Sequence, residues 1–111
     1  MEFAVEVRAF VDANGISPFE KWFNELNAQA AARVAVNLVR IESGNFSNTK
    51  SISGGVYELR IGFGPGYRVY FGKDDNKIII LLGGGTKKKQ SVDIKKAHEL
   101  WKAYKKRKKQ E

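Results

Sequence analysis

The chain opens with apolar residues at every second position. Phe3, Val5 and Val7 are separated by small or charged residues, and this period of two is typical of a half-buried strand. Asn14-Gly15 interrupts the pattern. The segment Ser17-Pro18-Phe19-Glu20 that follows has the form of a capping box with proline at the first helical position. We therefore expect a strand and then a helix that begins at this segment.

Two helical stripes follow, with apolar residues spaced three and four apart. The first stripe consists of Phe19, Trp22, Phe23 and Leu26, and the second of Ala31, Val34, Ala35, Leu38 and Ile41. The second pattern ends near Gly44, and the short separation of the two predicts a helical hairpin whose stripes enter the core. Residues 43–55 are rich in Ser, Asn and Gly, which predicts a loop.

Three strand-like runs come next, at residues 56–61, 67–72 and 77–82. The glycine- and proline-containing segment 62–66 and the turn Asp74-Asp75-Asn76 connect them, which predicts an antiparallel meander. The last run is apolar on both faces, so we expect it at the centre of the sheet, with the first strand as its other neighbour.

A final amphipathic helix is predicted after residue 90. Its apolar positions are Ile94, Ala97, Leu100, Trp101 and Tyr104, and its opposite face is mostly lysine. The predicted order is β-α-α-β-β-β-α. This indicates an α+β fold in which a helical hairpin and a C-terminal helix pack on a four-stranded, mainly antiparallel sheet. A length of 111 residues predicts one domain over residues 1–111, with a basic tail at about 102–111.

The charge of the chain is concentrated at one end. Residues 1–85 carry nine Lys/Arg and nine Asp/Glu, whereas the last 26 residues carry eleven Lys/Arg and three Asp/Glu, so the net charge of +8 lies entirely after residue 85. This asymmetry predicts a surface for a polyanion, and a solubilising tail is the alternative. The chain has no cysteine and no apolar run long enough for a membrane helix. We therefore expect a cytoplasmic protein that does not associate with membranes.

Two arginines in neighbouring predicted strands are the first candidates for chemistry. The alternation of each strand places Arg60 and Arg68 on one face of the sheet. If they lie beside the basic turn Lys87-Lys88-Lys89, several cations converge and suit a phosphodiester, because preorganised cations stabilise the charge that develops during displacement at phosphorus. In the alternative, both arginines are ordinary strand residues, and one pairs with Glu58. The pattern leaves both interpretations open.

Two tyrosines in the same region offer faces for unpaired bases. Tyr67 falls in the apolar register, which favours packing, whereas Tyr70 shares the face of Arg68, which favours stacking.

Several catalytic classes are excluded or disfavoured. His98 is the only histidine, so a pair of imidazoles is excluded, and we interpret it as structural. Asp74-Asp75 is more simply a turn than a metal site. The segment Gly83-Gly84-Gly85-Thr86-Lys87 lacks the spacing of a nucleotide-binding loop. Its glycines either form an anion-binding nest or, as we prefer, end the strand. We expect no cofactor and no metal.

Spaced motifs resemble a known family. They are Glu58-Leu59-Arg60, the segment Gly64 to Phe71, and Leu81-Leu82-Gly83-Gly84, the last followed by lysines, Gln90, Asp93-Ile94 and Ala97. Over most of residues 17–107 they resemble the RelE/ParE toxin superfamily, and within it the phage-derived, HigB-like addiction module killer proteins. The predicted order of elements also agrees with that family's fold.

The resemblance implies a toxin of a type II toxin–antitoxin system, an endoribonuclease that cuts messenger RNA on the ribosome without metal. Arg68 would hold the scissile phosphate, Arg60 would assist, and Lys87 and Lys88 occupy the turn where better-studied relatives place a catalytic arginine. Those relatives carry a tyrosine where this chain has Ser91-Val92-Asp93-Ile94, so the general acid and base are unassigned, and a lysine of the turn is one hypothesis. The expected RNA-binding residues are Tyr67, Tyr70, Lys89, Lys95, Lys102, Lys105, Lys106 and Arg107.

Two other functions remain open. A ParE-like protein inhibits DNA gyrase without catalysis, and a simple RNA-binding module would bind RNA without toxicity. The partners that the resemblance implies are messenger RNA, the ribosome and a cognate antitoxin, often a helix-turn-helix protein.

Overall fold

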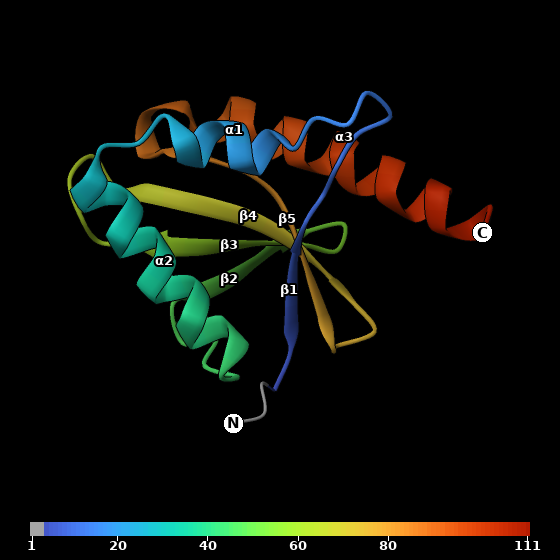
Figure 1. Cartoon of the computed structure of the whole chain (residues 1–111), viewed down its shortest axis with the longest axis horizontal. Coiled ribbons are helices and arrows are strands. Elements are labelled where there is room, and N and C mark those ends of the chain that lie inside the picture. The colour runs from blue at the N-terminus through green and yellow to red at the C-terminus, as the bar shows by residue number, and fades with distance from the viewer. Residues whose placement is uncertain (1–3) are drawn as a thin grey trace.

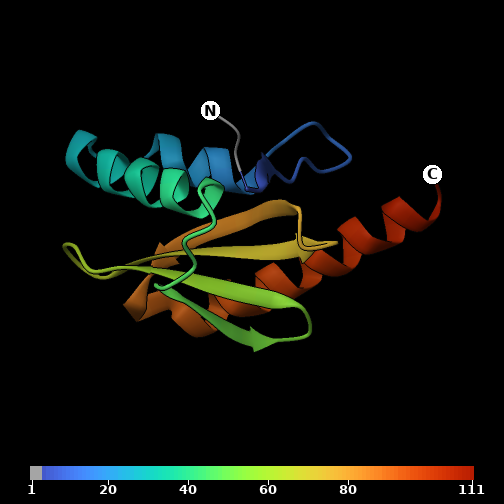
Figure 2. The same cartoon turned by 90° about the horizontal axis from the view of Figure 1, so that it is seen from below.

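A five-stranded sheet lies between a helical hairpin on one face and one long helix on the other (Figures 1 and 2). The computed structural model describes residues 4–111. Its elements are β1 (Glu6–Ala9), α1 (Pro18–Asn24), α2 (Ala28–Glu42), β2 (Thr49–Ser53), β3 (Val56–Ile61), β4 (Tyr67–Asp74), β5 (Ile78–Thr86), the short 3-10 helix η1 (Lys87–Lys89) and α3 (Gln90–Lys109). The strand order is β1-β5-β4-β3-β2, with β1 parallel to β5 and the other pairs antiparallel.

The sheet has one strand more than the sequence predicts. The predicted loop at residues 43–55 contains β2, which pairs with β3 through a turn at Gly54-Gly55, where both φ angles are positive. β2 has the sequence Thr-Lys-Ser-Ile-Ser and is mostly exposed. A polar edge strand of this kind lacks the apolar alternation that identifies a strand. The sequence pattern therefore does not predict its pairing with β3. The predicted four-stranded sheet and element order are therefore corrected to five strands.

The apolar strand β5 lies inside the sheet but not at its centre. β4 is the middle strand, and β5 lies between β4 and β1. Both faces of β5 are nevertheless covered, because Ile79 and Leu81 belong to the core under the helical hairpin and Ile80 and Leu82 to the core under α3. The predicted neighbour, the first strand, is confirmed by the pairing of β1 with Ile78–Leu81 of β5.

Local signals place the helix starts. The Ser17 hydroxyl accepts a hydrogen bond from the Glu20 N–H (3.1 Å) and caps α1, and the Asn27 side chain caps α2 through the Ala30 N–H (2.9 Å). Each cap satisfies an amide that the helix leaves unpaired.

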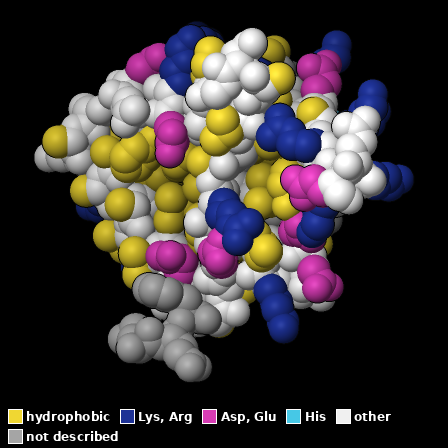
Figure 3. All heavy atoms as spheres, turned by 45° about the vertical axis from the view of Figure 1, so that its right-hand side comes forward, with side chains coloured by type: hydrophobic (Ala, Val, Ile, Leu, Met, Phe, Trp, Pro, Cys, Tyr) yellow, Lys and Arg dark blue, Asp and Glu magenta, His cyan; other side chains and the backbone are white. Residues whose placement is uncertain are grey.

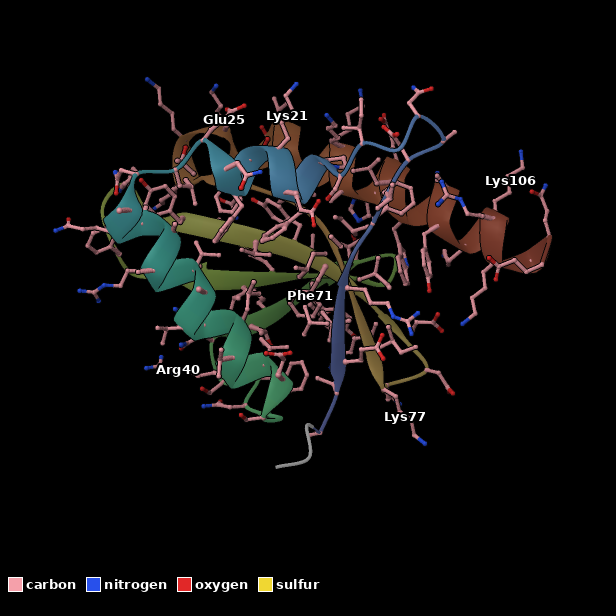
Figure 4. The ribbon with its side chains drawn as sticks, viewed as in Figure 1. Lys21, Glu25, Arg40, Phe71, Lys77 and Lys106 are labelled. Carbon is pink, nitrogen blue, oxygen red and sulfur yellow. The ribbon has the colours of Figure 1, made fainter. Side chains whose placement is uncertain are left out.

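Phe3, the first residue of the predicted strand, lies outside the described residues. Phe71 is fully buried near the middle of the core under the hairpin (Figure 4).

The expected basic tail is the second half of α3 and is attached to the body of the molecule. The Tyr104 hydroxyl donates to the Asp74 carboxylate (2.5 Å), and the Lys108 ammonium pairs with the same group. Arg107 donates to the carbonyl of Val11 (2.7 Å). Segment 102–109 is therefore a docked helix rather than a loose tail. No helix within residues 4–111 is long and apolar enough to cross a membrane.

Candidate functional site

Cationic residues gather at one end of the sheet, where β3, β4 and β5 meet η1. In the antiparallel register Arg60 lies opposite Arg68, and Arg68 lies opposite Gly85, one residue before Thr86 and η1. Residues paired in this way present their side chains on the same face. The two arginines therefore share the α3 side of the sheet, and Arg68, on the strand next to β5, is the one that lies beside the start of η1 with its three lysines. We call Arg60, Arg68, Lys87, Lys88 and Lys89 the cationic end.

The carbonyl of Gly66 connects Arg68 to the first lysine of η1. It accepts a hydrogen bond from Arg68 Nη1 (2.9 Å) and another from the Lys87 backbone N–H (3.0 Å). Gly66 has a φ of 79°, which favours glycine. The loop between β3 and β4 thus fixes Arg68 against the start of η1.

Arg68 is also held by a buried carboxylate. Its Nε donates to Glu58, which in turn accepts a hydrogen bond from Gln90 Nε2 (2.9 Å). The side chain of Arg68 is 11% exposed and that of Glu58 is 2% exposed. The sequence left open whether one arginine pairs with Glu58, and Arg68 is that arginine. Its charge is balanced inside the protein and its position is fixed.

The other members of the cationic end are accessible. Arg60 is exposed and forms no ion pair with any residue in 4–111, and Lys87, Lys88 and Lys89 are exposed on η1. These are the side chains of the cationic end that are free to approach an anion from solvent. Arg68, by contrast, is mostly covered.

Tyr67 is packed as its apolar register predicts, whereas Tyr70 departs from the expectation of stacking. Tyr67 is half-buried in the hairpin-side core, with its ring centroid 6.3 Å from Trp22 and 6.4 Å from Phe63. Tyr70 is fully buried under α3. Because Tyr70 exposes no ring face, the expectation that a base stacks on it is corrected.

The expected RNA-binding cations of α3 fall into two groups. Lys95, Lys102 and Lys106 are exposed and lie seven and four residues apart, so they form one stripe on the outer face of the helix. Figure 4 shows Lys106 pointing away from the body. Lys105 instead lies over the Trp101 ring (5.9 Å), and Arg107 over the Phe10 ring (5.0 Å). On the face seen in Figure 3, basic and acidic side chains are interspersed, with hydrophobic atoms between them.

A cleft of about 260 Å³ lies between α1 and α3, beside the second half of β5. β1 is only four residues long and pairs with Ile78–Leu81, so no described strand lies beside the rest of β5 on that side. α1 contacts β5 instead. The lining residues are Pro18, Lys21, Trp22, Glu25, Tyr70, Leu82, Gly83, Gly84, Asp93, Lys96 and Ala97.

The glycines at 83–85 belong to β5 and shape this cleft. A Cβ at Gly84 would overlap the Trp22 ring, and one at Gly85 would overlap the Asp93 carboxylate, whereas one at Gly83 would meet nothing within 4 Å. β5 continues through them to Thr86, so they do not end the strand, and none of the three has the positive φ that an anion-binding nest uses. Three glycines inside a strand signal close approach of other groups, and the sequence contained that signal.

Two buried polar atoms, on residues that line the cleft, have no hydrogen-bond partner in the described part of the chain. They are the Tyr70 hydroxyl and Oδ2 of Asp93. Burial raises the pKa of Tyr70 to about 12, with nearby Glu58 and Asp93 acting in the same direction. Burial also raises the pKa of Asp93, although Lys89 and Lys96 oppose the shift. Unpartnered buried polar groups destabilise a fold, so neither atom contributes a hydrogen bond to stability.

The chain is similar to known proteins over most of its length. The chain is 42% identical over 80 residues to an uncharacterized protein of Haemophilus influenzae, an alignment that spans 71% of this chain and 81% of the relative. The family model described as "Phage derived protein Gp49-like (DUF891)" matches residues 21–108, from α1 to the last turn of α3. The chain therefore belongs to the phage-derived Gp49-like protein family.

Proposed function

We propose that this chain is the toxin of a type II toxin–antitoxin system and acts as a ribosome-dependent messenger RNA endonuclease of the HigB-like branch. The Gp49-like family is a family of RelE/HigB-type toxin-like proteins, which is compatible with this role. The observation that carries the proposal is the cationic end, where Arg60 and Arg68 are paired across β3 and β4 beside the lysines of η1.

The proposed reaction is an internal transesterification of RNA. The ribose 2′-oxygen loses its proton and forms a bond to the neighbouring phosphorus, while the bond from phosphorus to the 5′-oxygen breaks and that oxygen gains a proton. Negative charge grows on the phosphoryl oxygens as this occurs, and fixed cations stabilise it. Arg60, Lys87 and Lys88 contact the phosphate in this scheme. Their side chains are exposed at one end of the sheet.

Arg68 contributes a fixed, mostly covered guanidinium to the proposed mechanism. Glu58 and the Gly66 carbonyl hold two of its nitrogen atoms, so it presents a guanidinium in a fixed orientation rather than a mobile charge. Such preorganisation favours transition-state stabilisation, because little reorganisation is needed during the reaction. The proton donor and acceptor are not assigned to residues.

The exposed stripe of α3 gives the proposed toxin a second contact with its target. Lys95, Lys102 and Lys106 bind the backbone of ribosomal RNA in this proposal, together with Lys89 at the start of the helix. Their exposure and spacing support the proposal, since lysines binding phosphates release counterions and give salt-dependent affinity. The proposed partners are messenger RNA, the ribosome and an antitoxin.

Controlled expression in bacteria, with mapping of messenger 5′ ends, tests this function. We expect the wild type to stop growth and produce new 5′ ends. The informative variant is Arg60→Ala, because Arg60 makes no ion pair within residues 4–111 and its removal leaves no buried charge unpaired. Arg40→Ala, which removes an exposed arginine of α2 on the face of the sheet opposite the side chains of Arg60 and Arg68 (Figure 2), is the matched control.

The expected result is loss of cuts and of toxicity in Arg60→Ala, with both retained in Arg40→Ala. A DNA-damage response without new 5′ ends would instead identify a gyrase inhibitor. Healthy cells, together with salt-dependent RNA binding by the purified protein, would identify a simple RNA-binding module. Either of these outcomes overturns the nuclease proposal.

A further inference from the structure

We propose that Arg33 of α2, held on the ring of Phe63, binds a backbone phosphate of the RNA strand that reaches the cationic end. The inference rests on the proposed action on RNA and deepens it, because it extends the path of the strand from the α3 side of the sheet to the hairpin side. Its basis is an exposed guanidinium placed over a ring of the loop that also fixes Arg68 and the start of η1.

The ring of Phe63 positions the guanidinium of Arg33. The central carbon of the guanidinium lies 4.8 Å from the centroid of this ring, although the Arg33 side chain is exposed. Phe63 is half-buried and stacks on Tyr67, with 6.4 Å between the two ring centroids. A cation over an aromatic ring is attracted to it, and a long side chain that is already held loses less conformational entropy when it binds. Arg33 is therefore an exposed cation with a preferred position.

The charge of Arg33 is not offset by neighbours along the chain. α2 contains no acidic residue before Glu42, its last residue, and residues 59–73, which include the β3–β4 loop, contain none at all. Arg33 forms no ion pair with any residue from 4 to 111. This part of the hairpin side is therefore locally cationic, and a cationic surface attracts polyanions.

The β3–β4 loop joins Arg33 to the cationic end. Phe63 and Gly66 are the ends of a turn closed by a hydrogen bond from the Gly66 N–H to the Phe63 carbonyl (3.1 Å), and the Cα atoms at the ends of such a turn lie within about 7 Å. The Gly66 carbonyl accepts from Arg68 and from the Lys87 N–H. Figures 1 and 2 both show this loop, the first half of α2 and η1 at one end of the molecule. A strand that crosses the loop can therefore contact Arg33 and the cationic end together.

A phosphate of single-stranded RNA is the anion that this arrangement suits best. The planar fork of arginine can donate two hydrogen bonds to phosphate oxygens while its flat face stays on an aromatic ring. Cations on both sides of the loop suit a ligand whose charges repeat along a flexible chain. An acidic protein segment is the other polyanion of this kind. RNA is favoured because the loop adjoins the side chains that the proposed reaction assigns to the phosphate.

The test measures the affinity of the full-length protein for a short, fluorescein-labelled single-stranded RNA by anisotropy over a range of salt concentrations. Each phosphate that a protein neutralises on a single strand contributes about 0.7 to the slope of log affinity against log salt. We expect Arg33→Ala to reduce the slope by about this amount and to weaken binding by about fivefold or more at low salt.

Arg40→Ala is the matched control for the loss of charge. Arg40 is exposed on the same helix, seven residues or about 10 Å further along its axis, and Figure 4 shows it on the second half of α2, pointing away from the body. The variant removes the same charge from the same element. We expect it to keep the wild-type slope, because Arg40 lies beyond the loop.

Two further variants test the role of the ring. Phe63→Leu keeps the charge of Arg33 and an apolar side chain in the loop, and should weaken RNA binding by about two- to threefold. It should cause no further loss in the background of Arg33→Ala, because the two residues act as one unit. Arg33→Lys keeps the charge without the planar fork and should bind with intermediate affinity. Thermal unfolding checks that each variant is folded.

Three outcomes would overturn the inference. The first is an unchanged slope in Arg33→Ala, and the second is an equal loss of affinity in Arg33→Ala and Arg40→Ala. The third uses poly-L-glutamate as a separate probe. If Arg33→Ala weakens the binding of this polymer and leaves RNA binding unchanged, the surface accepts an acidic protein segment and the inference is wrong.

Mapping of messenger 5′ ends in cells separates this inference from the nuclease proposal. New 5′ ends produced by the wild type, together with an unchanged RNA slope in Arg33→Ala, would remove the Arg33 contact and leave the nuclease standing. A reduced slope in Arg33→Ala without any new 5′ ends from the wild type would support the contact and overturn the nuclease.

Discussion

Two aspartates, one near each end of α3, have opposite surroundings: Asp74 of β4 is hydrogen-bonded, and Asp93 of α3 is buried with an oxygen that is unpartnered within residues 4–111. Near the C-terminal end, Asp74 accepts hydrogen bonds from Lys108 and Tyr104, which lower its pKa. Near the N-terminal end, burial raises the pKa of Asp93, whose Oδ2 has no partner in the part of the chain that the structure describes. One carboxylate fastens the helix to the sheet, and the other is held at a cost beside an open cleft.

The difference separates groups that stabilise the fold from groups whose burial destabilises it. Polar side chains that are satisfied inside the protein contribute to stability, whereas perturbed titratable groups in a cleft are typical of functional sites. Arg68 belongs to the first kind, because its pairing with Glu58 balances its charge and also fixes its orientation within the cationic end. The predictions below test this separation, beginning with the largest effect.

Removal of Glu58 should have the largest effect on stability. Glu58→Ala leaves the guanidinium of Arg68 mostly buried without its carboxylate, and breaking a buried pair in this way costs about 3–5 kcal/mol. The free energy of unfolding in urea is the measurement. Glu6→Ala is the control, because Glu6 and Arg8 form a pair with both side chains more than half exposed, which is worth about 0–1 kcal/mol. Equal losses in both variants would show that Arg68 does not depend on Glu58.

Substitution of Asp74 should have a moderate, pH-dependent effect. Asp74→Asn weakens the contacts with Tyr104 and Lys108 and should cost about 1–2 kcal/mol at pH 7. The folded-state pKa of Asp74 is lowered, so its stabilising contribution is complete above the ordinary aspartate pKa and is lost as the pH falls through the folded-state value. Wild type and variant should therefore converge in strong acid, as measured by thermal unfolding across pH. A constant difference at all pH values would contradict this account of the anchor.

Substitution of Asp93 should have the smallest effect, with the opposite sign. Asp93→Asn removes a carboxylate that is costly to ionise where it is buried, so we expect a gain of about 0.5–1 kcal/mol at pH 7. The folded-state pKa is raised, so the cost in the wild type disappears as the pH falls through that value. The advantage of the variant should then vanish in acid. A loss of stability at neutral pH would mean that Asp93 serves the fold after all.

The parts of this architecture that depend on local pattern could be predicted from the sequence. The cap at Ser17 and the alternation that brings Arg60 opposite Arg68 both depend on neighbours along the chain or on the strand period. β2 could not be found, because its polar residues pair through the backbone at an edge.

The cleft could not be found for a different reason. Trp22, Tyr70 and Asp93 come from three distant segments, and each residue alone fits a core stripe, a strand face or a first helical turn. Only the shortness of β1 and the packing of α1 against the rest of β5 bring them together. The glycines at 83–85 were the one local sign of this close approach.

The most direct test of the central claim is the single-turnover rate of messenger cleavage on purified ribosomes by wild type, Arg60→Ala and Arg40→Ala. If the cationic end stabilises the reacting phosphate, the rate of Arg60→Ala should fall by about 10²-fold or more, with Arg40→Ala at the wild-type rate and all three proteins equally stable. Cleavage by Arg60→Ala at the full rate would contradict the account.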